Sequence, residues 1–288
     1  MKHLVTVGVD GSPESRAAAV WGAREASLRE VPLRLVHVID WPVSPAVPRL
    51  GRETADRWAN ETLAEALEDV RRRYPHLEKT TRRLSGRPAA ALAVEAADAD
   101  LLVLGSRGLG SLVGFLVGSV GMATLVATET PVTLVRVADE LGDEPTRYGE
   151  MIVGVDIHEA PDRVLSFAFE EATRRDCALR VIHGWKVSPT YRGFPFIDSD
   201  GEREADRSVA QMLDELLLPW RQKFPSVSVT QKAFKGSASR QLVQAAADAD
   251  LVVVGRHLRR SPLGVHLGPV THAVLHHAAA PVAVIAHA

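Results

Sequence analysis

The sequence DADLLVLG at residues 98–105 recurs as DADLVVVG at residues 248–255. Each copy is a short acidic turn followed by a run of leucine and valine that ends at a glycine. A short apolar run bounded by turn residues is typical of a strand that is buried on both faces of a sheet. The repeat therefore predicts two buried strands that occupy the same place in two copies of one domain.

Other segments repeat in the same order and extend the duplication over the whole chain. HLVTVGVD (3–10) matches EMIVGVD (150–156), LRLVH (33–37) matches LRVIH (179–183), and TPVTLVRV (130–137) matches APVAVIAH (280–287). The spacing between the copies grows only in the loop after the second strand, as expected of a duplicated domain. We expect domains over residues 1–138 and 150–288, joined by a polar, turn-rich linker over residues 139–149.

Within each copy, apolar runs alternate with segments of helical periodicity. In the first copy the pattern predicts strands near 3–9, 33–39, 78–83, 100–105 and 131–136, with helices over 13–30 and 52–73. This alternation indicates an α/β class with two tandem doubly wound (Rossmann-like) domains and mainly parallel sheets. Ser12 and Pro13 read as the N-cap and first turn of a helix. Ligands of such sheets bind beyond the carboxyl ends of the strands, where strand order reverses.

Composition excludes several classes of protein. The 288 residues carry a formal net charge of −2, which gives no general attraction to nucleic acid or to an anionic membrane. Cys177 is the single cysteine, so no intramolecular disulfide or thiolate metal cluster forms, and a buried structural thiol is expected. The apolar window 112–127 is too short to span a bilayer. The chain opens directly on a strand pattern without a signal-like leader, so we expect a cytoplasmic protein.

A glycine-rich segment follows the strand that ends at Gly105. Its spacing is Gly105-x2-Gly108-x9-Gly118-Ser119, and the helical sequence VGMATLVA follows. A helix start offers unpaired backbone N–H groups to a phosphate, and a glycine there lets the phosphate approach closely. The segment lacks the Gly-Lys-Ser/Thr of a Walker A loop, and it does not follow the first strand as a dinucleotide fingerprint would. The residues alone leave two interpretations open, a phosphate site and a purely structural tight turn.

Four segments taken together resemble the universal stress protein family. They are VGVDGSPES (7–15), HVID (37–40), the glycine–serine segment and the closing TPV strand, and they recur in order over nearly all of each half. The chain resembles the tandem form of the family, in which one polypeptide holds two such domains. The resemblance implies five-stranded sheets of strand order 3-2-1-4-5. It also implies ATP binding, together with Mg2+, in the subclass that keeps the glycine–serine pattern.

The resemblance carries roles onto matching residues of the first copy. Adenosine would be held at the strand-end turn and the second strand, by Asp10, Gly11 and the backbone near Val38. The loop over the ribose and α-phosphate would be shaped by Gly105 and Gly108. The β- and γ-phosphates would be bound by Gly118, Ser119 and the N–H of Val120. Asp10 has an alternative interpretation as a turn residue, and Arg107 could neutralise phosphate or simply be solvated.

The second copy keeps part of this pattern. Asp156, Gly255 and Gly268 match, but Leu258 replaces Gly108 and Pro269 replaces Ser119. Proline has no N–H to give a phosphate, although the basic residues in RHLRR (256–260) could attract one. We therefore expect the second ATP site to be weaker, altered or dead, and ordinary ATP binding there is disfavoured.

Histidines offer the other candidate chemistry. His272 and His276 have the i, i+4 spacing that can hold a metal, but no further ligand lies near them in sequence. We expect a surface cluster rather than a metal site. His37 and His183 recur inside the second strands and are interpreted as packed strand residues.

The resemblance favours an ATP-binding stress-response regulator. Its nucleotide state would tune binding to a regulatory protein partner that the sequence does not identify. The two domains would form an intramolecular pseudo-dimer through their last strands, and the family also implies a homodimer through the same strands. No nucleophile with an activating base is recognisable, so no catalytic residue is assigned. Two alternatives stay open: a slow ATPase or autophosphorylating enzyme, and a scaffold that works without nucleotide.

Overall fold

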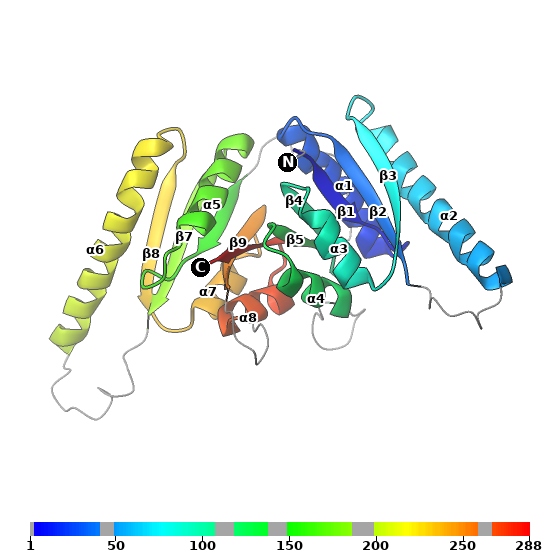
Figure 1. Ribbon diagram of the computed structural model, residues 1–288. Helices are drawn as coiled ribbons and strands as arrows, with labels where there is room; N and C mark the ends of the chain where they lie inside the picture. Colours follow the sequence, from blue (N-terminus) through cyan, green and yellow to red (C-terminus); the bar gives the residue numbers. More distant parts are fainter. Residues whose placement is uncertain (1–2, 41–48, 107–117, 138–148, 186–198, 259–266) are drawn as a thin grey trace. The chain divides into compact units, whose positions relative to one another are not determined.

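The computed structural model describes residues 3–40, 49–106, 118–137, 149–185, 199–258 and 267–288. These residues fall into two compact units, residues 1–144 and 145–288. Each unit alternates strands with helices along the chain (Figure 1).

Unit 1 contains five strands and four helices among its described residues. They are β1 (Val5–Gly8), α1 (Pro13–Leu28), β2 (Leu33–Ile39), α2 (Arg49–Arg73), β3 (Lys79–Ser85), α3 (Pro88–Ala96), β4 (Leu101–Gly105), α4 (Ser119–Ala127) and β5 (Val132–Val135). Unit 2 repeats this order. Its elements are β6 (Glu150–Gly154), α5 (Asp162–Arg175), β7 (Ala178–Trp185), α6 (Ser199–Lys223), β8 (Val229–Lys235), α7 (Ala238–Ala245), β9 (Leu251–His257), α8 (Pro269–His277) and β10 (Val282–His287).

The first strand of each unit lies at the centre of a parallel sheet. In unit 1 the order is β3-β2-β1-β4-β5, and Val5 pairs with both Leu33 and Leu101. In unit 2 the order is β8-β7-β6-β9-β10, and Met151 pairs with both Leu179 and Leu251. The predicted α/β class and the predicted strand order 3-2-1-4-5 are confirmed.

Helices cover both faces of the unit 1 sheet, which explains why its central strands β1 and β4 are mostly apolar and buried. Helix α1 packs on one face, where a Cβ added to Gly22 would lie 2.4 Å from the Val7 side chain. Helix α3 covers the opposite face, where Leu92 lies beside Gly8. The central strands are fully buried as a result, and Val103 on β4 has no exposed surface.

Helix α1 begins where the sequence predicts. Ser12 is the N-cap, its hydroxyl accepts a hydrogen bond from the Ser15 N–H at 3.2 Å, and Pro13 occupies the first turn. Pro13 has no N–H to leave unpaired, and its fixed φ angle suits the first helical position. The Ser12 side chain also accepts a bond that the first turn cannot make internally. The start of this helix is therefore fixed by local sequence.

Each unit also buries a carboxylate between two arginines. In unit 1, Glu95 of α3 is 4% exposed and pairs with Arg34 of β2 at 2.6 Å and with Arg82 of β3 at 2.7 Å. In unit 2, Glu171 lies within α5 and pairs with Arg174 and Arg175 of the same helix. A buried carboxylate needs such partners because desolvation penalises an isolated charge.

Cys177 is buried, as the sequence predicts. Burial raises the pKa of its thiol to about 11, which suppresses the reactive thiolate at neutral pH. Among the described residues, no helix has the length and apolar character needed to cross a membrane.

Candidate functional site

The reversal of strand order places a cavity at the carboxyl end of β1. From β1 the chain crosses to β2 on one side, while β4 lies on the other, so the loops after these strands separate there. A cavity of about 290 Å³ fills this position. Its described lining comprises Gly8, Val9, Asp10, Ser12, Ser15, Val36, His37, Val38, Pro88, Leu92, Leu104, Gly105, Gly118, Ser119, Val120 and Gly121.

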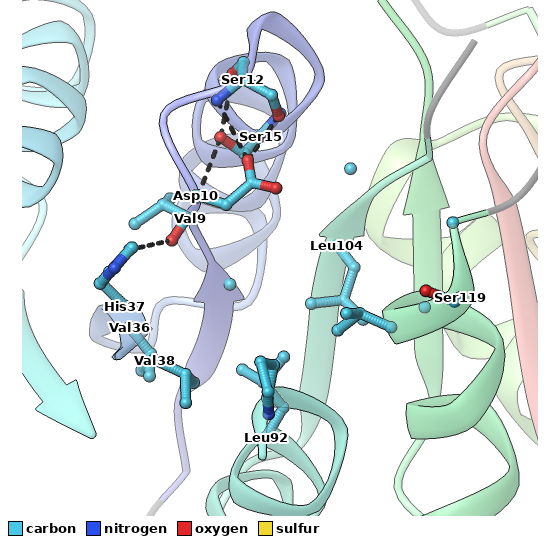
Figure 2. Close-up of a pocket in the computed structure, with 16 residues that line it drawn as sticks. Val9, Asp10, Ser12, Ser15, Val36, His37, Val38, Leu92, Leu104 and Ser119 are labelled. Carbon is cyan, nitrogen blue, oxygen red and sulfur yellow. Dashed lines mark hydrogen bonds between the residues drawn. The ribbon is translucent and has the colours of Figure 1, made fainter. Parts of the chain in front are cut away.

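The turn after β1 holds Asp10 at the rim of the cavity. One carboxylate oxygen of Asp10 accepts hydrogen bonds from the Ser12 N–H at 3.0 Å and the Ser12 hydroxyl at 2.5 Å. The Asp10 N–H donates to the Ser15 hydroxyl at 3.2 Å (Figure 2). Gly11 has a φ of 82°, a left-handed value that favours glycine. The exposed carboxylate is thus held in a fixed orientation by the start of α1.

Strand β2 supplies the second wall. Val36 and Val38 line the cavity, and the His37 ring between them is 3% exposed. Its Nδ1 lies 2.8 Å from the Val9 carbonyl oxygen, and its ring meets Trp58 edge-on at 5.0 Å between centroids. His37 is a packed strand residue, as predicted, and it also borders the cavity. Figure 2 shows its bond to Val9.

Helix α4 begins on the opposite side of the cavity, with the apolar side chains of Leu92 and Leu104 between it and the Asp10 turn (Figure 2). Gly118 is its N-cap, and no side chain among the described residues caps this end. The first helical bond runs from the Met122 N–H to the Gly118 carbonyl at 3.1 Å. The backbone N–H groups of Ser119, Val120 and Gly121 come before this first bond, so the helix offers them no carbonyl partner. All three residues line the cavity.

The structure brings most of the predicted site residues of unit 1 to this one cavity. They are Asp10, Val38, Gly105, Gly118, Ser119 and Val120. Gly11 lies in the turn beside them, whereas Arg107 and Gly108 lie outside the described residues. Gly105 has a structural reason to be glycine, because an added Cβ would lie 2.6 Å from the Glu14 backbone at the start of α1.

Sequence reasoning missed part of the lining. Ser12 and Ser15 were recognised only as the start of a helix, although their hydroxyls also orient the Asp10 turn. Leu92 and Leu104 close the apolar part of the cavity, yet nothing in their own sequence distinguishes them from other core leucines. Gly121 follows the predicted motif by two residues and could have been found by extending it into the helix.

Unit 2 has a cavity of about 420 Å³ at the corresponding place. The predicted residues Asp156, Gly255 and Gly268 all line it, together with Pro269, whereas Leu258 is not among its lining residues. Gly184 stands where unit 1 has Val38, and an added Cβ there would lie 2.8 Å from the Ala238 backbone nitrogen. The two cavities therefore share a plan but differ in the side chains that shape them.

The expected surface histidines lie on α8. The rings of His272 and His276 are 4.4 Å apart between centroids. The described parts of the chain contain no group of three or more histidine, cysteine, aspartate or glutamate side chains arranged to hold a metal ion.

Comparison with known proteins gives the same result for both units. The model of the family described as "Universal stress protein family" matches residues 1–136 and 147–286. The chain is 34% identical to the universal stress protein Rv2005c of Mycobacterium tuberculosis over 98% of this chain and 97% of the relative. It is 33% identical to the universal stress protein Rv2623 of the same species over 97% and 95% of the two chains.

A solved structure agrees at the level of fold. The crystal structure of a universal stress protein from Archaeoglobus fulgidus matches with a TM-score of 0.73 and 17% identity, covering 99% of this chain and 98% of that one. The chain, with its two matching domains, belongs to the universal stress protein family.

Proposed function

We propose that unit 1 binds ATP, together with Mg2+, and that its nucleotide state regulates the binding of a protein partner. The observation that carries the proposal is the start of α4, which has no side-chain cap among the described residues and borders the same cavity as Asp10. Helix α1 also begins at this cavity, but Ser12 caps it. Of these two helix starts, α4 therefore has the N–H groups available for a phosphate.

The remaining residues fit the other parts of a nucleotide. Val36, Val38, Leu92 and Leu104 provide apolar surface for a base, and the Asp10 carboxylate can accept hydrogen bonds from ribose hydroxyls. The Ser119 hydroxyl stands at the first turn of α4, where it can add a bond to a phosphate oxygen. A bound Mg2+ ion would supply positive charge to the triphosphate. Each of these contacts binds or orients ATP, and none requires an enzymatic reaction.

Gly118 gives a direct test of this proposal. Its φ of −61° is accessible to any residue, so the Gly118→Leu variant should fold. The added side chain would occupy the approach of the phosphates to α4. We expect ATP affinity, measured by isothermal titration calorimetry, to fall at least about a hundredfold, since several charge-assisted bonds are lost together.

A matched control adds the same bulk at the far end of the helix. Ala127 is exposed at the last position of α4, so Ala127→Leu should leave ATP affinity unchanged. Equal ATP affinity in Gly118→Leu and in the unsubstituted protein would overturn the proposed site.

A further inference from the structure

The unit 2 cavity is larger than the unit 1 cavity, and the helix that borders it begins later in the chain. Helix α1 begins at Pro13, three residues after Asp10, whereas α5 begins at Asp162, six residues after Asp156. In unit 1 the helix backbone packs against the end of β4, at Gly105. In unit 2 the His287 ring takes that place, and an added Cβ on Gly255 would lie 2.6 Å from its Nε2. At this place a histidine side chain in unit 2 therefore replaces the helix backbone of unit 1.

The start of α8, which borders this cavity, offers fewer hydrogen-bond donors than the start of α4 does in unit 1. Pro269 stands at the first position of α8 and has no N–H to donate. Thr271 replaces Gly121, and its hydroxyl already donates to the Gly255 carbonyl at 2.7 Å. The start of α8 therefore presents one backbone donor fewer, and its threonine hydroxyl is already engaged.

The charge in the cavity also opposes a triphosphate. Glu159 stands where unit 1 has Pro13, and it joins Asp156 in the lining. No lysine or arginine is found among the described lining residues. The described lining of the unit 1 cavity has no lysine or arginine either, so the difference between the two cavities is the second carboxylate, Glu159, which lies 3.7 Å from the His287 Nε2. An added carboxylate disfavours a ligand that carries several negative charges.

One histidine in the lining of this cavity, His183, has a ring nitrogen that can accept a hydrogen bond. His183 is 2% exposed, and its Nδ1 lies 3.0 Å from the Val155 carbonyl oxygen. A carbonyl only accepts, so Nδ1 carries the proton and Nε2 is left as an acceptor. Within the described structure this buried Nε2 has no hydrogen-bond partner, and neither has the buried Nδ1 of His257. Buried polar atoms without a partner are costly, and a ligand that donates hydrogen bonds would relieve that cost.

We propose that the unit 2 cavity binds an uncharged nucleoside whose base carries an exocyclic amine, such as adenosine, in preference to a nucleoside triphosphate. Ile182, Leu242 and Val254 keep the apolar surface that a base requires. An exocyclic amine and ribose hydroxyls donate hydrogen bonds to the kind of acceptors that His183 and Asp156 provide. The inference rests on the proposed function only in its assumption that the base and ribose bind alike in the two units.

Calorimetry on the full chain separates the two sites. The protein is first saturated with ATP and Mg2+, and adenosine is then titrated into it. We expect one ATP and one adenosine per chain. Failure of adenosine to bind, or binding of two ATP molecules per chain, would overturn the proposal.

A substitution of His183 tests whether adenosine binds in the unit 2 cavity. The His183→Asn variant can keep a donor for the Val155 carbonyl while it removes the Nε2 acceptor. We expect adenosine affinity to fall about tenfold, the effect of one hydrogen bond, with ATP affinity unchanged. The matched control is His277→Asn, because His277 is exposed on α8 and does not line the cavity. Unchanged adenosine affinity in His183→Asn would place the nucleoside elsewhere and contradict the proposal.

These experiments distinguish failure of the unit 2 nucleoside site from failure of the proposed ATP site in unit 1. If the unsubstituted chain binds no ATP, the proposed function of unit 1 is wrong, yet adenosine binding that weakens in His183→Asn still supports the unit 2 site. As a converse test, the triple substitution Glu159→Pro, Pro269→Ser and Thr271→Gly restores the unit 1 residues. A second ATP per chain is then expected, and its absence would show that these residues do not cause the discrimination.

Discussion

At the scale of single residues, the two cavities differ most in their histidines. His37 and His183 hold equivalent places in the second strands, and each bonds through Nδ1 to the carbonyl at the end of the neighbouring first strand. His257 and His287 have no such counterparts in unit 1. Their rings lie 5.3 Å apart between centroids at the paired ends of β9 and β10. Unit 2 therefore carries two histidine rings that unit 1 lacks at these strand ends.

His287 should make the stability of the protein depend on pH. Burial lowers the pKa of its imidazole, and the charges of His257 and Arg163 lower it further, against the raising effects of Glu159 and the Ala288 backbone. An unfolded chain has a histidine pKa of about 6.5, so below that pH the unfolded state binds more protons than the folded state. The free energy of unfolding should therefore fall as the pH falls below about 6.5.

The variant His287→Val removes this source of pH dependence. Valine is the residue that unit 1 has at the equivalent position, Val137. We expect urea unfolding measured at pH 7 and pH 5 to show a smaller loss of stability than in the unsubstituted protein. The exposed His277, changed to valine, serves as the control and should keep the original loss. The same loss in His287→Val would show that His287 does not account for the pH dependence.

At the scale of elements, helix starts decide what each cavity offers. The Ser12 hydroxyl caps α1 by accepting a hydrogen bond from the Ser15 N–H, one of the N–H groups that the first turn leaves without a helical partner. Helices α4 and α8 have glycine at the N-cap and no side-chain cap among the described residues. The first of these helices starts with Ser119 and the second with Pro269, so equivalent helices in one chain present different hydrogen-bond donors to the two cavities.

The cap of α1 is testable by itself. Ser12→Ala removes the acceptor for the Ser15 N–H and the hydroxyl bond to Asp10, so the free energy of unfolding should fall by about 1 kcal/mol. Urea denaturation measures the change. Ser12→Asn retains a capping oxygen and should recover most of the loss. No difference between the two variants would mean that the cap contributes nothing to stability.

At the scale of the whole molecule, duplication has given two units with the same strand order and different cavities. Because ATP is proposed to bind unit 1 alone, hydrogen exchange should slow there on addition of ATP and Mg2+. We expect protection in peptides that cover the Asp10 turn and α4, through the stabilisation that any ligand gives to the state it binds. Peptides from β6 and α8 are the internal control. Equal protection in both units would contradict a single ATP site per chain.

Association of the domains through their last strands stays a prediction from the family resemblance. The homodimer that the family resemblance also implies can be tested by measuring the mass of the protein in solution with light scattering. A dimer would agree with the homodimer that the family implies, and a monomer would exclude it under those conditions.

The sequence by itself determined the duplication, the fold class and the position of unit 1's cavity. Apolar runs such as DADLLVLG mark strands buried on both faces, and Ser12 with Pro13 marks a helix start, because both signals act through neighbouring residues. The predicted helix over 13–30 is observed as Pro13–Leu28, so its start was predicted correctly and its end lies two residues earlier than predicted.

Only the tertiary structure decided which distant groups meet. It paired Glu95 with Arg34 and Arg82 from two other elements, and it placed Leu92 against the unit 1 cavity. It also set the His287 ring beside Gly255, at the place where unit 1 has the start of α1 beside Gly105. Such contacts depend on how the elements pack in three dimensions. The spacing of residues along the sequence does not predict them, because the residues lie far apart in the chain.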